Sequence, residues 1–146
     1  MLLLLFLVAL LLLSRRSIGV REETNVFGQP LEPCSVEGMP TTGYTRSGRC
    51  ETHLGDAGKH HVCVDISQMD FCGATGQSNW CQGKRNWCVC QWAFAEAVRA
   101  VGCANVNVVC DATNMRALEA YTKTDSVALQ CLRSKCGQAS ASAAGL

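Results

Sequence analysis

Cysteine is the residue type in this sequence with the most chemical potential. The chain has 146 residues and 11 cysteines, and every cysteine lies between Cys34 and Cys136. Cysteine side chains form disulfides, bind metal ions as thiolates or act as nucleophiles. Because the total is odd, at least one thiol must stay free, bind a metal or pair with another chain.

Four residues form a candidate zinc site: His60, Cys63, Cys88 and Cys90. One imidazole nitrogen and three sulfurs are an acceptable tetrahedral ligand set for Zn²⁺. On a strand, Cys88 and Cys90 would point to the same face, which favours a shared ligand. The spacing differs from that of the usual paired Cys motifs, and the same sulfurs could instead fill a core or form disulfides. We expect no other cofactor.

A redox dithiol is a second possibility for Cys88 and Cys90. The helix predicted to follow Cys90 would stabilise a thiolate at its N-terminus. However, the motif lacks the two-residue spacer of thioredoxin-like sites, and no thioredoxin-like βαβ pattern surrounds it.

A cysteine–histidine nucleophile is a third possibility, since His60 and His61 lie close to Cys63 in the sequence. Neighbours on a strand point to opposite faces, so these positions do not by themselves place a base. Asp56 and Asp65 could orient a histidine, although scattered carboxylates are usually solvated. No nucleophile elbow, phosphate loop or paired-carboxylate motif is present, and whether the chain is an enzyme stays open.

Short strands mixed with helices must position these residues. Val62, Val64 and Ile66 alternate with polar residues or cysteine, which predicts a strand with one buried face. Without regular βαβ spacing, the pattern favours an α+β fold, in which two or three helices cover a small sheet. We expect strands near 44–46, 61–66, 88–90 and 105–109, and helices over 91–101, from 113 or 114 to about 123, and from 126 to 137. Residues 67–86 are polar and contain glycines, which predicts a loop.

The first residues predict a targeting segment. Leu2 to Leu13 is an unbroken apolar run, too short for a helix to cross the ~30 Å hydrocarbon core. Ser17 and Gly19 then place small residues as a signal peptidase requires. We therefore expect a signal peptide over residues 1–19, a single cysteine-rich domain over 20–137 and a disordered tail over 138–146. A short N-terminal signal anchor is the alternative, because no Lys or Arg precedes the apolar run.

Charge argues against several classes of partner. Without Arg15 and Arg16, the 12 acidic residues exceed the basic residues by one, and no basic cluster remains. Nucleic-acid and anionic-membrane surfaces need clustered Lys and Arg, so we expect no nucleic-acid partner. No second apolar stretch approaches the length of a membrane span, and the cysteine count predicts a secreted or lumenal protein.

Several short motifs together resemble a family of small, mainly bacterial proteins known as domain of unknown function 2237. The resemblance covers roughly residues 25–123 and implies a compact two-layer α+β domain, with no activity attached to the family. Its motifs are Asn25-Val-Phe-Gly-Gln-Pro-Leu-Glu-Pro-Cys34, Thr42-Gly-Tyr44, Gly48-Arg-Cys50, Gly55-Asp-Ala-Gly-Lys-His60, Val62-Cys63, Trp87-Cys-Val-Cys90 and Asp111-Ala-Thr-Asn114.

The resemblance divides the cysteines into two sets. Five match the family pattern: Cys34, Cys50, Cys63, Cys88 and Cys90. Six are additions, and their even number suggests three bridges among themselves: Cys72, Cys81, Cys103, Cys110, Cys131 and Cys136. We expect Cys72 to pair with Cys81, because their short loop closes easily. Cys131 and Cys136 lie too far apart along one helix to pair together, so we expect them to reach Cys103 and Cys110.

Two functions from different classes follow. The first is a secretory-pathway structural or binding module held by disulfides. The second is a thiol-based redox or zinc-binding protein that uses Cys63, Cys88 and Cys90. The sequence does not identify a ligand, substrate or partner.

Overall fold

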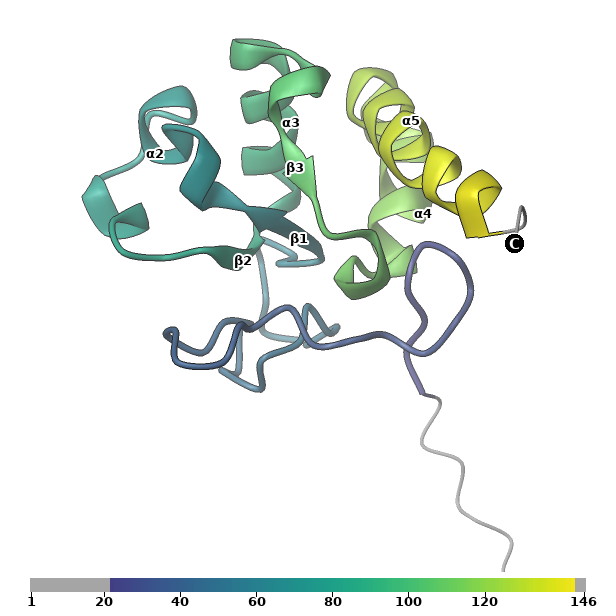
Figure 1. Ribbon diagram of the computed structural model, residues 1–146, viewed down its shortest axis with the longest axis horizontal. Coiled ribbons are helices and arrows are strands. Elements are labelled where there is room, and N and C mark those ends of the chain that lie inside the picture. The colour runs from purple at the N-terminus through teal and green to yellow at the C-terminus, as the bar shows by residue number, and fades with distance from the viewer. Residues whose placement is uncertain (1–21, 144–146) are drawn as a thin grey trace, which may run out of the picture.

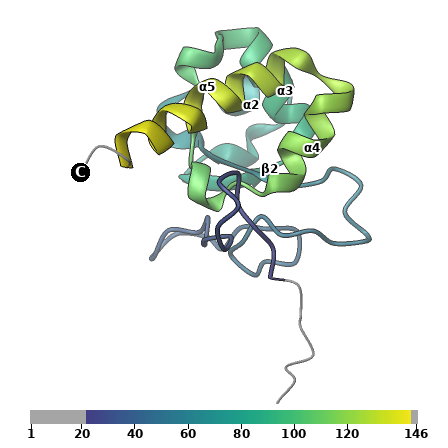
Figure 2. The same ribbon diagram turned by 90° about the vertical axis from the view of Figure 1, so that its right-hand side faces the viewer.

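The computed structural model describes residues 22–143. Helices lie on one side of a small three-stranded sheet, and a long irregular segment over residues 22–60, the loop layer, lies on the other side (Figure 1). A view turned by 90° shows the same arrangement (Figure 2). The α+β class expected from the sequence is therefore confirmed. The signal peptide predicted for residues 1–19 lies outside the described residues.

The sheet consists of β1 (Val62–Asp65), β2 (Asn86–Val89) and β3 (Asn107–Val108), in the order β2-β1-β3 with antiparallel pairing. Side chains alternate between its two faces, as the apolar pattern predicts. Val62 and Val64 enter the core on the helical side, whereas Cys63 faces the loop layer. Cys63 also pairs in register with Cys88 of β2, so the two sulfurs start from neighbouring positions.

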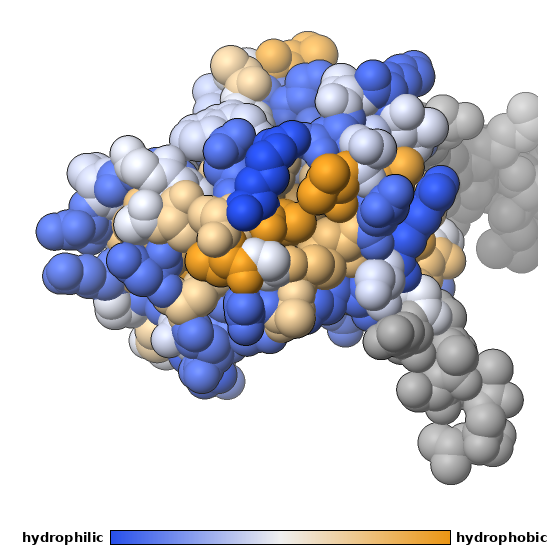
Figure 3. All heavy atoms as spheres, turned by 90° about the horizontal axis from the view of Figure 1, so that it is seen from above, coloured by the Kyte–Doolittle hydropathy of each residue, from blue (hydrophilic) through white to orange (hydrophobic). Residues whose placement is uncertain are grey.

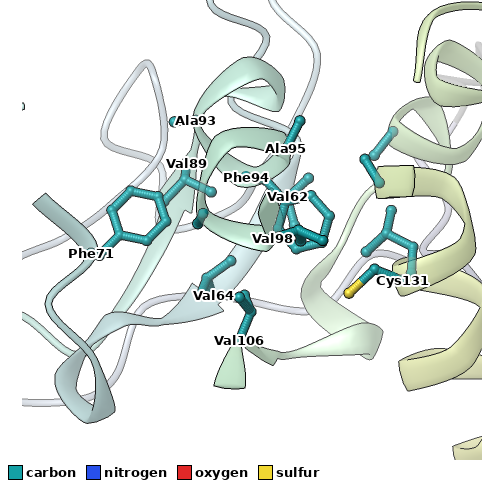
Figure 4. Close-up of a cluster of buried hydrophobic side chains, with 14 of the residues drawn as sticks. Val62, Val64, Phe71, Val89, Ala93, Phe94, Ala95, Val98, Val106 and Cys131 are labelled. Atoms are coloured by element: carbon teal, nitrogen blue, oxygen red, sulfur yellow. The ribbon is translucent and has the colours of Figure 1, made fainter. Parts of the chain in front are cut away.

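Helix α3 (Gln91–Val101) provides much of the core, with the bounds that the sequence predicts. Phe94 and Val98 are almost completely buried and meet Val62 and Val64 from the sheet (Figure 4). Burying a side chain of this size contributes roughly 1.5–3 kcal/mol. Gly102 ends the helix with a φ of 81°, a conformation that favours glycine.

Two further helices complete the helical layer. The Asn114 side chain caps α4 (Met115–Thr124) by accepting a hydrogen bond from the backbone N–H of Arg116, in line with the expected cap. The Tyr121 hydroxyl donates to the carbonyl of Gln91, which ties α4 to the start of α3. Helix α5 (Ser126–Ala143) continues beyond Gly137, where we expected its end, so the tail expected from residue 138 begins inside this helix.

The irregular regions differ from the sequence-based expectation in two places. Residues 44–46 form a turn and not a strand, because the Arg46 N–H bonds back to the Gly43 carbonyl. The segment expected to be a loop over 67–86 contains a short helix, α2 (Phe71–Ala74), capped by Asp70, whose carboxylate accepts from Gly73 N–H.

Five disulfides hold the domain together. The six additional cysteines pair among themselves as expected, and the remaining two bridges join the loop layer to the sheet. The pairs are Cys72–Cys81, Cys103–Cys131, Cys110–Cys136, Cys34–Cys63 and Cys50–Cys88. The bridge from Cys34 reaches β1 and the bridge from Cys50 reaches β2, and all four of these cysteines are buried.

The surface above the helices carries apolar side chains at its centre, surrounded by hydrophilic ones (Figure 3). Between residues 22 and 143, no helix combines the length and apolar character needed to cross a membrane.

The two classes of bridge should differ in their effect on stability. Replacing both Cys34 and Cys63 by alanine is expected to lower the free energy of unfolding by about 2–5 kcal/mol. This loss should exceed that from the matched alanine pair at Cys72 and Cys81 by about 1 kcal/mol, because the sequence separations of 29 and 9 residues give unfolded loops of different length. Urea denaturation of the two double variants measures the difference. A larger loss from the Cys72–Cys81 pair would contradict this account.

Candidate functional site: a cysteine–histidine–aspartate arrangement

Cys90 is the free cysteine of the chain, since the other ten form the five disulfides. It follows the last residue of β2 and is the N-cap of α3. Its side chain is partly exposed. The position therefore combines a thiol with the positive end of a helix dipole, which stabilises a thiolate.

His60 is the direct partner of this thiol. Its Nε2 lies 3.0 Å from Cys90 Sγ, although the residues are 30 positions apart in the sequence. The main chain brings them together, because the Gln91 N–H is shared between the carbonyls of Gly58 and Lys59. This short nitrogen–sulfur distance is suitable for proton transfer between the two side chains.

Glycine at position 58 allows this contact. A Cβ atom placed there would lie 2.7 Å from Cys90 Sγ and 3.1 Å from the Cε1 atom of His60. Any larger residue would therefore displace either the thiol or the imidazole, so Gly58 is part of the packing that forms the pair.

Asp56 holds the other nitrogen of His60. Its Oδ1 lies 2.7 Å from His60 Nδ1, and its side chain is only 1% exposed. Its carboxylate also accepts hydrogen bonds from the backbone N–H groups of Lys59 and His60. Lys59 adopts a φ of 51°, an uncommon conformation for a residue with a side chain. The tight turn over 56–60 therefore orients the carboxylate and the imidazole together.

The electrostatics of the pair follow from these contacts. The hydrogen bond with Cys90 raises the pKa of His60 above its usual range and outweighs the effect of burial, and the Asp56 carboxylate raises it further. Burial opposes ionisation of Asp56, but the hydrogen bonds from His60 and Lys59 hold the pKa of this carboxyl below its usual range. A charged aspartate therefore faces a histidine that readily accepts a proton.

The adjacent histidine has a different role. His61 is buried, and its Nδ1 lies 3.0 Å from the Gln91 side-chain amide, away from the thiol. Burial lowers the pKa of His61. Consecutive histidines thus have opposite pKa shifts because one faces a thiol and a carboxylate, whereas the other is enclosed beside a neutral amide.

A cleft of about 360 Å³ opens beside Cys90 and His60. Its walls come from the loop layer, β2, α2 and the start of α3. The lining side chains are mostly aromatic or apolar, with one cation, Arg46. They include Tyr44, Arg46, Phe71, Trp80, Trp87 and Ala93. Within the described part of the chain, the backbone N–H groups of Trp92 and Ala93 have no hydrogen-bond partner, as is usual in the first turn of a helix.

The structure brings together two of the four residues proposed from the sequence as zinc ligands. His60 and Cys90 are in contact, whereas Cys63 is bridged to Cys34 and Cys88 to Cys50. Bridged sulfurs are not thiolate ligands, so the four-ligand zinc set stays a prediction that would require those bridges to open. The dithiol proposed for Cys88 and Cys90 likewise requires Cys88 to leave Cys50.

Sequence reasoning did not join Asp56, His60 and Cys90 into one unit. It considered Asp56 and Asp65 as residues that could orient a histidine, of which the structure brings only Asp56 to His60, and it placed the histidines beside Cys63. The useful signal lies in Gly55-Asp-Ala-Gly-Lys-His60, where a tight turn places Asp56 and His60 four residues apart. The aromatic cleft was also missed, because no pattern in the sequence brings together Trp80 and Trp87, whose ring centres lie 5.8 Å apart.

The opposite shifts of the two histidines give a direct test by NMR titration. His60 should titrate above the usual value of about 6.5 and His61 below it. Because folding raises the pKa of His60, its protonated form favours the folded state. This contribution is complete below the unfolded pKa and is lost as the pH rises through the folded one. Cys90→Ala should lower the pKa of His60, and a His60 that titrates below His61 would contradict the geometry.

Comparison with known proteins places the chain in a family without assigning an activity. None of the curated proteins compared with the chain matches it. Residues 24–130 match a family described as "Uncharacterized protein conserved in bacteria (DUF2237)". This range contains the whole sheet, α3 and α4, and all three members of the cysteine–histidine–aspartate arrangement. The chain belongs to the DUF2237 family.

Proposed function

We propose that this protein is a thiol enzyme in which Cys90 is the nucleophile, His60 the base and Asp56 the residue that orients the base. The observation that carries the proposal is the unbroken chain of contacts from Asp56 Oδ1 to His60 Nδ1, 2.7 Å, and from His60 Nε2 to Cys90 Sγ, 3.0 Å. A nucleophile, a base and a third group that orients the base are the recurring parts of such sites.

Acyl transfer is the reaction class that these parts support best. The Cys90 sulfur would attack a carbonyl carbon while its proton passes to His60 Nε2. The carbon–leaving-group bond then breaks, and the leaving group takes its bonding electrons and that proton, which leaves a thioester on Cys90. Water, deprotonated by His60, attacks the thioester, and the carbon–sulfur bond breaks. The acid is released and the thiol is restored.

The start of α3 supports this reaction. The partnerless N–H groups of Trp92 and Ala93 are close in sequence to the nucleophile, and Ala93 lines the cleft. Such donors stabilise the oxyanion of a tetrahedral intermediate when they point to where it forms.

Acylation of the native protein by 4-nitrophenyl acetate tests this proposal. After quenching in acid, mass spectrometry should find one acetyl group on Cys90 and none on Cys90→Ser. His60→Asn should lower the acylation rate about tenfold or more at pH 6.5, because the variant lacks the base that accepts the thiol proton. The matched control is His53→Asn, an exposed histidine with no hydrogen bond to Cys90, which should react like the unmodified protein. Equal rates for the two histidine variants would contradict the role of His60.

A binding module is the second candidate, favoured by the aromatic walls of the cleft and by the five disulfides that fix them. In that case a ligand would occupy the same cleft without covalent chemistry. The two functions differ in the role of the thiol: a binding module would lose little affinity in Cys90→Ser and would never accumulate an acylated cysteine.

We also propose that the mature protein is secreted or lumenal. Disulfides persist in oxidising compartments, and the apolar run from Leu2 to Leu13 favours entry into the secretory pathway. N-terminal sequencing of the protein exported from a eukaryotic cell should begin at Val20. Recovery of intact Met1 on membrane-bound protein would contradict cleavage and favour the signal anchor.

A further inference from the structure

Two cations flank one aromatic ring of the cleft. The guanidinium carbon of Arg46 lies 5.1 Å from the centre of the Trp87 ring, and the ammonium of Lys84 lies 5.3 Å from it. Both distances fall within the range of cation–π contacts. Trp87 and Arg46 line the cleft directly, so positive charge lies at the wall of the cavity beside Cys90.

Arg46 is the cation that lines the cleft, whereas Lys84 lies on the other side of the cleft wall, in a neighbouring hollow that it shares with Asp70. Neither Arg46 nor Lys84 takes part in an ion pair among residues 22–137, and no carboxylate lines the cleft. The nearest acid of the site, Asp56, is buried behind His60 and is already hydrogen-bonded. An unneutralised pair of cations beside a partly enclosed cavity attracts anions.

The backbone at Arg46 supports a specific role for this side chain. Arg46 and Lys59 are the non-glycine residues with positive φ in the described part of the chain, and both belong to the site. Such a conformation is strained and persists where surrounding contacts impose it. The Arg46 N–H and its Nη1 both donate to the Gly43 carbonyl, which fixes the turn and directs the guanidinium over Trp87.

We propose that the substrate of Cys90 is an acyl compound that carries an anionic group. The anion would lie near Arg46 and Lys84, an apolar or planar part would lie against Trp87 and Trp80, and the reacting carbonyl would lie beside Cys90. This inference rests on the proposed function, because it identifies what the nucleophile selects. The two claims are separable, since a thiol can be reactive without preferring anions.

A pair of alkylating reagents that differ mainly in charge tests the preference. Iodoacetate and iodoacetamide both react with the same thiolate, so the ratio of their rate constants does not depend on how much of Cys90 is ionised. On the unreduced native protein, the iodoacetate/iodoacetamide ratio at Cys90 should exceed that of 2-mercaptoethanol. The excess should shrink at high salt, where partly exposed charges are screened.

Variants assign the effect to particular residues. Arg46→Asn removes the charge and keeps a residue that tolerates positive φ. Combined with Lys84→Gln, it should lower the ratio about three- to tenfold, as expected for unit charges several Å away. Arg85→Gln is the matched control, because Arg85 is more than half exposed and lies 4.0 Å from Asp65, outside the cleft. The charge of His60 is common to all of these proteins and does not account for a difference between them.

Each outcome separates the two claims. A raised ratio that falls in the double variant and persists in Arg85→Gln supports an anionic substrate. A ratio equal to that of 2-mercaptoethanol, or one unchanged in the double variant, overturns the inference, while rapid reaction with iodoacetamide would still support a nucleophilic Cys90. Failure of both reagents to label Cys90 overturns the inference together with the proposed function.

Discussion

Two buried disulfides attach the loop layer to the sheet, and the rest of the site depends on that attachment. Cys63 and Cys88 are opposite one another on neighbouring strands, and each is bridged to a residue of the loop layer. The loop layer over residues 22–60 contains no helix and no strand longer than a single bridge pair, so its backbone hydrogen bonds form turns and do not join it into a regular sheet or helix. Its buried cysteines replace the apolar core that such a segment lacks.

The chemical consequence is that neighbouring cysteines have different roles, one structural and one available for reaction. Cys88 and Cys90 are two residues apart, yet Cys88 is buried in a bridge whereas Cys90 is a free, partly exposed thiol. β2 ends at Val89, so the chain turns into α3 at Cys90 and the alternation of the strand no longer decides where its side chain points. Because the chain is bridged on either side of the turn over 56–60, at Cys50 in the loop layer and at Cys63 in β1, the turn is held between two fixed points and presents His60 to the thiol.

Much of the fold could be predicted from the sequence, because local patterns of residues determine it. The alternation of Val62 and Val64 identified a strand, and the apolar face of 91–101 identified α3 with its observed ends. Even the pairing of Cys131 and Cys136 with distant partners followed from helix geometry. The short helix α2 was missed, since four residues give too few turns for any periodicity.

Only half of the site could be predicted from the sequence, for a different physical reason. His60 and Cys90 were both singled out, but their contact spans 30 positions and depends on hydrogen bonds from Gln91 to two carbonyls of the loop layer. No local pattern encodes such a contact. The cleft is similar: Trp80 and Trp87 do pack against the core, and only the tertiary structure reveals that their other faces meet Arg46 and open space.

The central claim is that Cys90 is a free, reactive thiol whereas the other ten cysteines are bridged. Peptide mapping of the native protein tests this claim most directly. The unreduced protein would be treated briefly with less than one equivalent of chloroacetamide, denatured in acid and digested without reduction. The account predicts that the label lies on Cys90 alone and that the five bridges are recovered intact, including Cys34–Cys63 and Cys50–Cys88. Label on Cys63 or Cys88, or Cys90 recovered in a bridge, would contradict it.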